Sequence, residues 1–240
     1  MNNFRKLAIS AGILFIIYDI VDILSFLFLG PVTAINHLVS VSENASLVGT
    51  GAFLLIIGGL CASGIAISLY PILKKFNPAL ALAAVGFRIS EGVLRIVSVC
   101  ALLSIITLSH LFVKGGSPDQ PYFQTLYSLL YAGYRWVENV GSLLAFSVGC
   151  SLYYIVFYRT KLIPRWISVW GLVFGISGIV SCALVSTGLI APAGAVQVIM
   201  IVPMLPQEIV LAVWLIVKGF NPSVIAAHSE HISLNAQGEN

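Results

Sequence analysis

The chain has 240 residues, of which 59% are hydrophobic and 9% are charged, and its formal net charge is +3 at pH 7. Soluble globular domains carry charges on about a quarter of their residues, so this composition excludes an ordinary soluble domain. The mean hydropathy of +1.01 indicates a membrane protein whose chain crosses the bilayer several times.

Six apolar segments are long enough to cross a bilayer, which requires about 20 residues in a helix. We expect the spans at residues 7–29, 47–73, 79–107, 135–158, 166–188 and 193–217. A tyrosine-rich helix over 122–134 leads into the fourth span, and the first span is expected to be retained rather than cleaved as a signal peptide. The predicted fold class is an all-α, polytopic membrane bundle, with a transmembrane domain at 1–220 and a polar, flexible tail at 221–240.

The lysines and arginines between the spans indicate the orientation. Only Lys114 falls clearly in a loop on the side opposite the N-terminus. Basic residues concentrate on the cytoplasmic side of membrane proteins, so both termini are predicted to be cytoplasmic. The eight basic residues on the side of the N-terminus are Arg5, Lys6, Lys74, Lys75, Arg159, Lys161, Arg165 and Lys218.

The third span carries three charges in its middle, Arg88, Glu91 and Arg95. Spacings of three and four residues place them on one helix face. A charge at the centre of a bilayer costs roughly 2.5–3.5 kcal/mol, so this stripe is expected to face other helices or a wet cavity. The candidate ligand- or ion-binding residues are Asp19, Asp22, Arg88, Glu91, Arg95, Arg135, Glu138, Asn139, Gln207 and Glu208.

The candidate charges predict both pairing and protonation. By depth, we expect Arg88 to pair with Glu208, and Arg95 to pair with Asp19 or Asp22. Five carboxylates face three arginines, so full ionisation would leave a net charge of −2 inside the bilayer. Burial disfavours the charged form of a carboxyl group, whereas arginine keeps its charge. One or two carboxylates are therefore predicted to be protonated, or a cation or cationic ligand to complete the set. Asp19 and Asp22 lie one turn apart and are the best pair to share a proton.

Three functional hypotheses follow from these charges. In the first, the protein binds or moves a small polar or charged ligand, an ion or a proton, because intramembrane charges are functional candidates by default. In the second, the charges only fix helix packing, and the protein is a structural or regulatory partner of another membrane protein. In the third, Asp19, Asp22 or Glu91 serves as acid or base in an enzyme that acts on lipid.

The remaining polar residues give little support to catalysis or metal binding. His37 and His110 lie near the ends of spans without a third metal ligand. No nucleotide-binding or hydrolase motif occurs, and the basic residues act as loop anchors. We therefore expect no cofactor, no metal and no nucleic-acid partner, and we favour a non-enzyme over an enzyme. The cysteines are expected to be buried small hydrophobes: Cys61, Cys100, Cys150 and Cys182.

Small residues and prolines affect how the spans pack. Gly171 and Gly175 give the fifth span a small-residue face. We expect that face to pack within the chain, with a homo-oligomer contact through the same glycines as the alternative. Pro203 and Pro206 lie inside the sixth span and are expected to kink it or to free a carbonyl group.

Three passages carry a resemblance to a known family. They are LYPILKKFNPALA at 69–81 with the following Phe87, Arg88 and Glu91, YRTKLIP at 158–164, and QEIVLAVWLIVKGF at 207–220. They resemble a bacterial family of integral membrane proteins catalogued as domain of unknown function 4386. The resemblance implies a multi-pass helical protein of the bacterial cytoplasmic membrane and no established activity, so no functional residue can be carried over.

Overall fold

The computed structural model describes residues 3–116 and 120–228. Within those ranges every regular element is helical. Six helical runs are long and apolar enough to cross a membrane, which confirms the predicted all-α bundle of six spans. In chain order the elements are α1 (Asn3–Phe28), η1 (Gly30–Thr33), α2 (His37–Glu43), α3 (Ala45–Phe76), α4 (Pro78–Lys114), α5 (Gln120–Trp136), η2 (Val137–Ser142), α6 (Leu143–Thr160), α7 (Arg165–Ser186), α8 (Ala195–Ile201) and α9 (Met204–Val217).

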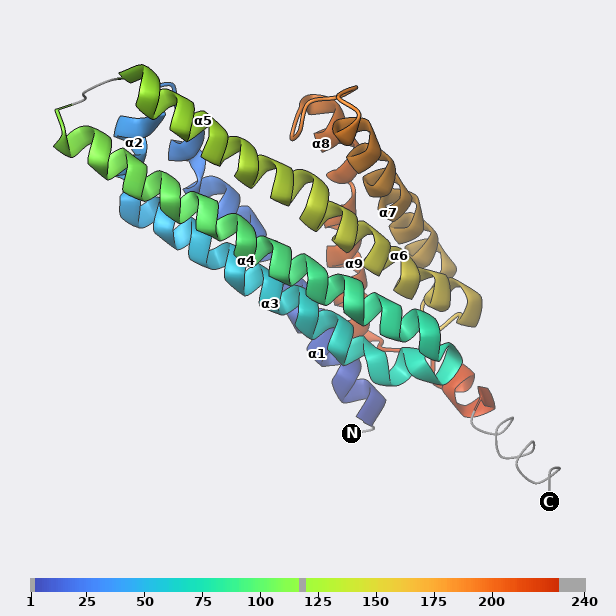
Figure 1. The fold of residues 1–240 in the computed structure, drawn as a ribbon. Helices are drawn as coiled ribbons and strands as arrows, with labels where there is room; N and C mark the ends of the chain where they lie inside the picture. The colour runs from blue at the N-terminus through green and yellow to red at the C-terminus, as the bar shows by residue number, and fades with distance from the viewer. Residues whose placement is uncertain (1–2, 117–119, 229–240) are drawn as a thin grey trace.

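The start of α1 and the residues that follow α9, up to 228, lie at one end of the bundle, which we call the N/C end (Figure 1). There the Lys75 ammonium lies 4.6 Å from the centre of the Phe4 ring. His228 Nε2 lies 2.7 Å from the Lys75 carbonyl oxygen. Residues 222–228, predicted as the start of a loose tail, are instead helical and reach this contact. Residues 229–240 lie outside the described part of the chain.

Two of the spans are much longer than predicted. α4 has 37 residues and α3 has 32. At about 1.5 Å per residue, α4 is roughly 55 Å long, whereas the hydrocarbon core of a bilayer is about 30 Å thick. At the far end of the bundle these helices pack with α2 and α5 (Figure 1), around a second buried apolar cluster that includes Leu38, Ile105 and Phe112. The expected bounds, 47–73 and 79–107, ended where the apolar runs weaken and missed part of this extension.

The fourth and sixth spans are irregular. The fourth runs from α5 through the π-helical segment η2 into α6 without a break, so the tyrosine-rich helix does continue into the span as predicted. The sixth is interrupted at Val202 and Pro203, between α8 and α9. Beside this break the Met200 carbonyl accepts a hydrogen bond of 3.0 Å from Ser177 Oγ.

Glycines bring α1, α3 and α4 close together. A Cβ atom on Gly92 would lie 2.6 Å from the carbonyl oxygen of Gly59, which is backbone and cannot move aside. A Cβ atom on Gly58 would lie 2.9 Å from Asp22 Oδ1 and 3.2 Å from Arg95 Nη1. The missing side chains therefore let an acidic residue of α1 reach an arginine of α4 past α3.

The glycines of α7 are used inside the chain. Gly171 lies against the ring of Tyr154, and Gly175 lies against the hydroxyl of Ser151. Tyr154 and Ser151 both belong to α6. The small-residue face of the fifth span is thus covered by the fourth, so these two glycines are not on a free surface for a second copy.

We predict that Gly92→Ala lowers the free energy of unfolding by about 1–3 kcal/mol, the usual cost of forcing extra atoms into a packed interior. Gly86→Ala, on the same helix, is the matched control, because nothing lies within 4 Å of a Cβ atom there. Alanine is the better helix former by about 1 kcal/mol, so the control is expected to be neutral or stabilising. Thermal unfolding of both variants in detergent checks this, and equal losses would contradict the close crossing.

Candidate functional site

The three charges of α4 face the interior, as their spacing predicts. Arg88 and Glu91 are completely buried, and Arg95 is 8% exposed. A neighbouring glycine makes room for the first arginine, because a Cβ atom on Gly149 of α6 would lie 3.1 Å from Arg88 Cγ. The stripe is therefore enclosed by other helices.

Two ion pairs hold these charges. Arg88 Nη1 lies 2.8 Å from Glu91 Oε2, within α4 itself. Arg95 donates two hydrogen bonds to Asp22 of α1, at 2.5 Å to Oδ1 and 2.9 Å to Oδ2. Such two-pronged arginine–carboxylate pairs are among the stronger polar contacts in proteins. Arg95 Nε also lies 3.5 Å from Glu91 Oε1, so the two pairs join into one network.

Tyr18 of α1 completes the network. Its hydroxyl oxygen accepts a hydrogen bond of 2.6 Å from Arg95 Nη2 and donates one of 2.9 Å to Glu91 Oε1. Its ring centre lies 5.3 Å from the Arg88 guanidinium and 5.0 Å from that of Arg95, within range of cation–π attraction. The sequence analysis missed Tyr18. Its place one turn before Asp22 on the same helix face is the signal that could have found it.

The structure corrects part of the predicted pairing. Arg95 does pair with Asp22, one of its two expected partners. Arg88 pairs with Glu91 of its own helix, so the expected pair with Glu208 is wrong. Both Asp22 oxygens accept hydrogen bonds from Arg95, and no hydrogen bond joins Asp22 to Asp19 within the described chain. A proton shared by the two aspartates stays a prediction.

Asp19 and Glu208 remain without an ion pair among the described residues. Asp19 is 4% exposed and Glu208 is 3% exposed, and Asp19 Oδ2 and Glu208 Oε1 are buried without a hydrogen-bond partner. Their helices are in direct contact, since a Cβ atom on Gly12 of α1 would lie 2.7 Å from the Ala212 carbonyl of α9.

Towards the far end, Glu138 and Arg135 have partners other than each other. Glu138 Oε1 lies 2.5 Å from Ser98 Oγ, which also lies 2.8 Å from the Arg95 carbonyl oxygen. Arg135 donates a hydrogen bond of 2.8 Å to the Tyr131 hydroxyl and another to the Pro192 carbonyl. Glu138 thus touches the edge of the network, whereas Arg135 lies outside it.

The two candidate amides bind neighbouring groups of the protein. Asn139 Nδ2 donates to the Arg135 carbonyl at 2.9 Å, one turn back along the same span. Gln207 Oε1 accepts from the Tyr154 hydroxyl at 2.7 Å, and its Nε2 donates to the Ile167 carbonyl at 3.2 Å. Gln207 therefore links α9 to α6 and α7 rather than joining the charged network.

Gln197 is a further polar residue that the sequence analysis did not single out. It is completely buried on α8. Its Nε2 donates a hydrogen bond of 2.8 Å to the Asn139 carbonyl in η2, and its Oε1 accepts one of 2.6 Å from the Ala193 N–H. This side chain joins the π-helical segment of the fourth span to the interrupted sixth span. A lone glutamine in an apolar run was its only sequence signal.

Two pockets lie at the ends of the bundle, and the charged network lines neither. A pocket of about 540 Å³ at the far end includes His37, Tyr127 and Arg135, and one of about 620 Å³ lies at the N/C end. Within residues 3–116 and 120–228, no three histidine, cysteine or acidic side chains are grouped as a metal site would need.

Comparison with known proteins supports the resemblance seen in the sequence. A family described as "Domain of unknown function (DUF4386)" matches residues 10–219. The chain belongs to this family. No curated protein and no solved structure matches the chain. The DUF4386 match includes the whole charged network and both unpaired carboxyl groups, but its description assigns no activity, so a function has to be argued from the geometry of these groups.

We predict that Tyr18→Phe lowers the free energy of unfolding by about 1.5–3 kcal/mol, the contribution of hydrogen bonds to charged groups. The change keeps the ring and removes only the hydroxyl that joins Arg95 to Glu91. Tyr70→Phe is the control, because among the described residues its hydroxyl has no hydrogen bond while its ring contact with Lys74 is kept. Denaturant unfolding in detergent measures both variants. A loss for Tyr70→Phe as large as for Tyr18→Phe would contradict the bridging role.

Proposed function

We propose that this protein is a proton-binding membrane protein of the transporter type, in the bacterial cytoplasmic membrane, and that Asp19 and Glu208 are the groups that take up and release the proton. The observation that carries this proposal is their burial on adjoining helices without an ion pair. Each also has an oxygen that no hydrogen bond satisfies.

Charge balance supports protons as the ligand. An unpaired charge in an apolar interior is so costly that the group is neutralised instead. The pairs Arg88–Glu91 and Arg95–Asp22 are each neutral. Glu138 and Arg135 are not paired with each other, but their charges are opposite and add up to zero. The remaining surplus is two negative charges, on the two carboxyl groups that lack partners. One proton on each makes the interior neutral, and no cluster of metal ligands competes for the site within the described chain.

The shape of the sixth span supports movement as well as binding. Glu208 lies on α9 shortly after the interruption at Val202 and Pro203. Transporters commonly place their sites at interrupted helices near the middle of the bilayer. The π-helical segment η2 is a second irregularity of the kind found at functional sites, and Gln197 connects it to α8. Protonation at Glu208 would thus act on a span that is already divided into two pieces.

A packing role is the second candidate for the network itself. Arg95, Glu91, Asp22 and Tyr18 are joined to one another by direct hydrogen bonds. Buried ion pairs of this kind can specify how helices meet without binding anything. We therefore assign the network to positioning, and the exchange of protons to the two carboxyl groups beside it.

The proposal predicts a pH dependence of stability that these two groups cause. Unfolded carboxyl groups are ionised between pH 5 and 8, so a native state that holds protons binds more of them than the unfolded chain does. Stability then falls as pH rises, by up to about 1.4 kcal/mol per pH unit for each proton. Asp19→Asn and Glu208→Gln are expected to flatten this slope, as measured by unfolding in detergent from pH 5 to 8.

The control is Glu43→Gln on α2, because Glu43 is exposed and outside the predicted spans. It should leave the slope unchanged. Wild-type stability that does not change with pH, or a slope that survives in both variants, would overturn proton binding at this site. Proteoliposomes with an enclosed pH-sensitive dye then separate binding from movement: a flux that is lost in Glu208→Gln supports transport, and an unchanged flux counts against it.

A further inference from the structure

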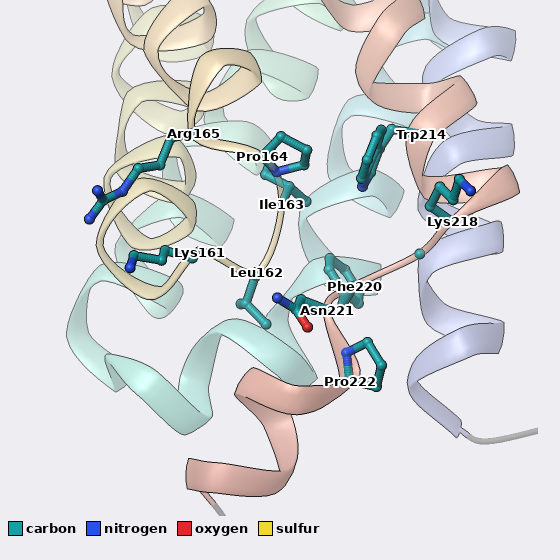
Figure 2. A pocket seen from close by; sticks show the side chains of 11 residues that line it. Lys161, Leu162, Ile163, Pro164, Arg165, Trp214, Lys218, Phe220, Asn221 and Pro222 are labelled. Atoms are coloured by element: carbon teal, nitrogen blue, oxygen red, sulfur yellow. The ribbon is translucent and has the colours of Figure 1, made fainter.

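The pocket at the N/C end lies between the turn that joins α6 to α7 and the end of α9 (Figure 2). Its volume is about 620 Å³, within the range of small-molecule sites. Its apolar lining includes Leu162, Ile163, Pro164, Trp214 and Phe220. Leu162 is completely buried, Ile163 is 2% exposed and Phe220 is 7% exposed, so these parts of the lining belong to the packed core.

The lining is fixed by contacts on both sides. The Asn221 N–H donates a hydrogen bond of 2.9 Å to the Leu162 carbonyl, which ties the chain after α9 to the α6–α7 turn. Phe220 packs on Phe157 of α6 with ring centres 6.1 Å apart. Arg5 of α1 binds the last carbonyls of α9, including that of Ile216 at 2.6 Å. The pocket is therefore formed before any ligand arrives.

Among the described residues that line this pocket, every charged side chain is positive. Lys161, Arg165 and Lys218 contribute to its lining, and no acidic residue does. Figure 2 shows Lys161 and Arg165 on one side of the apolar lining, with their charged ends directed outward, and Lys218 on the other side. The Arg165 guanidinium lies 5.2 Å from the centre of the Tyr158 ring, which is not part of the pocket lining, so the two lysines are the more available charges. The two lysines carry flexible side chains that can reach an anion in the pocket.

Lys161 occupies a backbone position that suits glycine better. It is the residue that ends α6, with φ 60° and ψ 30°, and its N–H binds the Phe157 carbonyl. This left-handed conformation is the usual place for glycine at the end of a helix, because a Cβ atom is unfavourable there. A lysine in this left-handed conformation lowers the free energy of unfolding relative to glycine. Its side chain is part of the pocket lining.

We propose that this pocket binds the phosphate headgroup of an anionic lipid from the leaflet at the N/C end. Phosphate is the anion that clustered basic side chains at a membrane surface recognise. Three spans end or begin here, at Thr160, Arg165 and Val217, so the pocket lies at headgroup level. Its tryptophan and apolar lining suit the glycerol and upper acyl chain of a lipid, which a free phosphate compound would leave uncovered.

Native mass spectrometry of the detergent-solubilised full chain tests this with phosphatidylglycerol, phosphatidylcholine and soluble glycerol phosphate as probes. We expect one retained phosphatidylglycerol and no comparable retention of phosphatidylcholine. Lys161→Gly should weaken retention about fivefold, the effect of one basic charge near a membrane surface, while thermal stability stays the same or rises because the backbone strain is relieved. That combination distinguishes a binding role from damage to the fold.

The double variant Lys161→Gly with Lys218→Gln should weaken retention by about 25-fold or more if the two charges act independently. Lys74→Gln with Lys75→Gln removes the same number of charges from exposed positions at the same end of the bundle, outside the pocket lining, and should leave retention unchanged. Equal losses in the two double variants would mean general attraction by a basic surface and would overturn the pocket. Displacement of the lipid by glycerol phosphate at equal concentration would overturn the lipid as the ligand.

Discussion

Helices inside a bilayer gain little by burying apolar side chains against one another, because the lipid around them is equally apolar. Close backbone packing and polar contacts therefore have to specify how the spans of this protein meet. The two-pronged bond from Arg95 to Asp22 is such a contact between α4 and α1. It forms only because Gly58 and Gly92 let α1, α3 and α4 approach, so the glycines and the ion pair depend on each other.

The ion pair between Arg95 and Asp22 also affects which carboxyl groups have no ion-pair partner among the described residues. Asp22 pairs with Arg95, and Glu91 pairs with Arg88. Glu91 also accepts a hydrogen bond from Tyr18. Arg88 thus pairs with Glu91 through Nη1 rather than with Asp19 or Glu208. None of the Arg88 nitrogens has a hydrogen-bond partner among the described residues. Asp19 and Glu208 are therefore left outside the ion pairs of the network, which is the basis for proposing them as the proton-binding groups.

The sequence was sufficient for the features that depend on one helix at a time. The six spans followed from apolar length, and the common face of Arg88, Glu91 and Arg95 followed from helical spacing. Contacts between helices were harder, because spacing does not determine how a helix is rotated or which helix lies beside it. Depth alone suggested Glu208 for Arg88, yet a partner three residues away on α4 is closer. Tyr18 and Gln197 carry no charge, so a search for charges missed them, and the π-helical segment has no sequence signature of its own.

The two ends of α9 differ in how firmly they are held. Its last turn is bound by Arg5, and the chain after it is bound to Leu162, beside the proposed lipid pocket. Its first residue follows the interruption at Val202 and Pro203, where the regular α-helical pattern between α8 and α9 is broken for two residues. Glu208 lies between these ends, about 15 Å from Lys218 at 1.5 Å per residue. A change of charge at Glu208 would therefore be relieved at the interruption rather than at the fixed end. The pocket at the N/C end would then serve as the anchor against which the rest of the span moves.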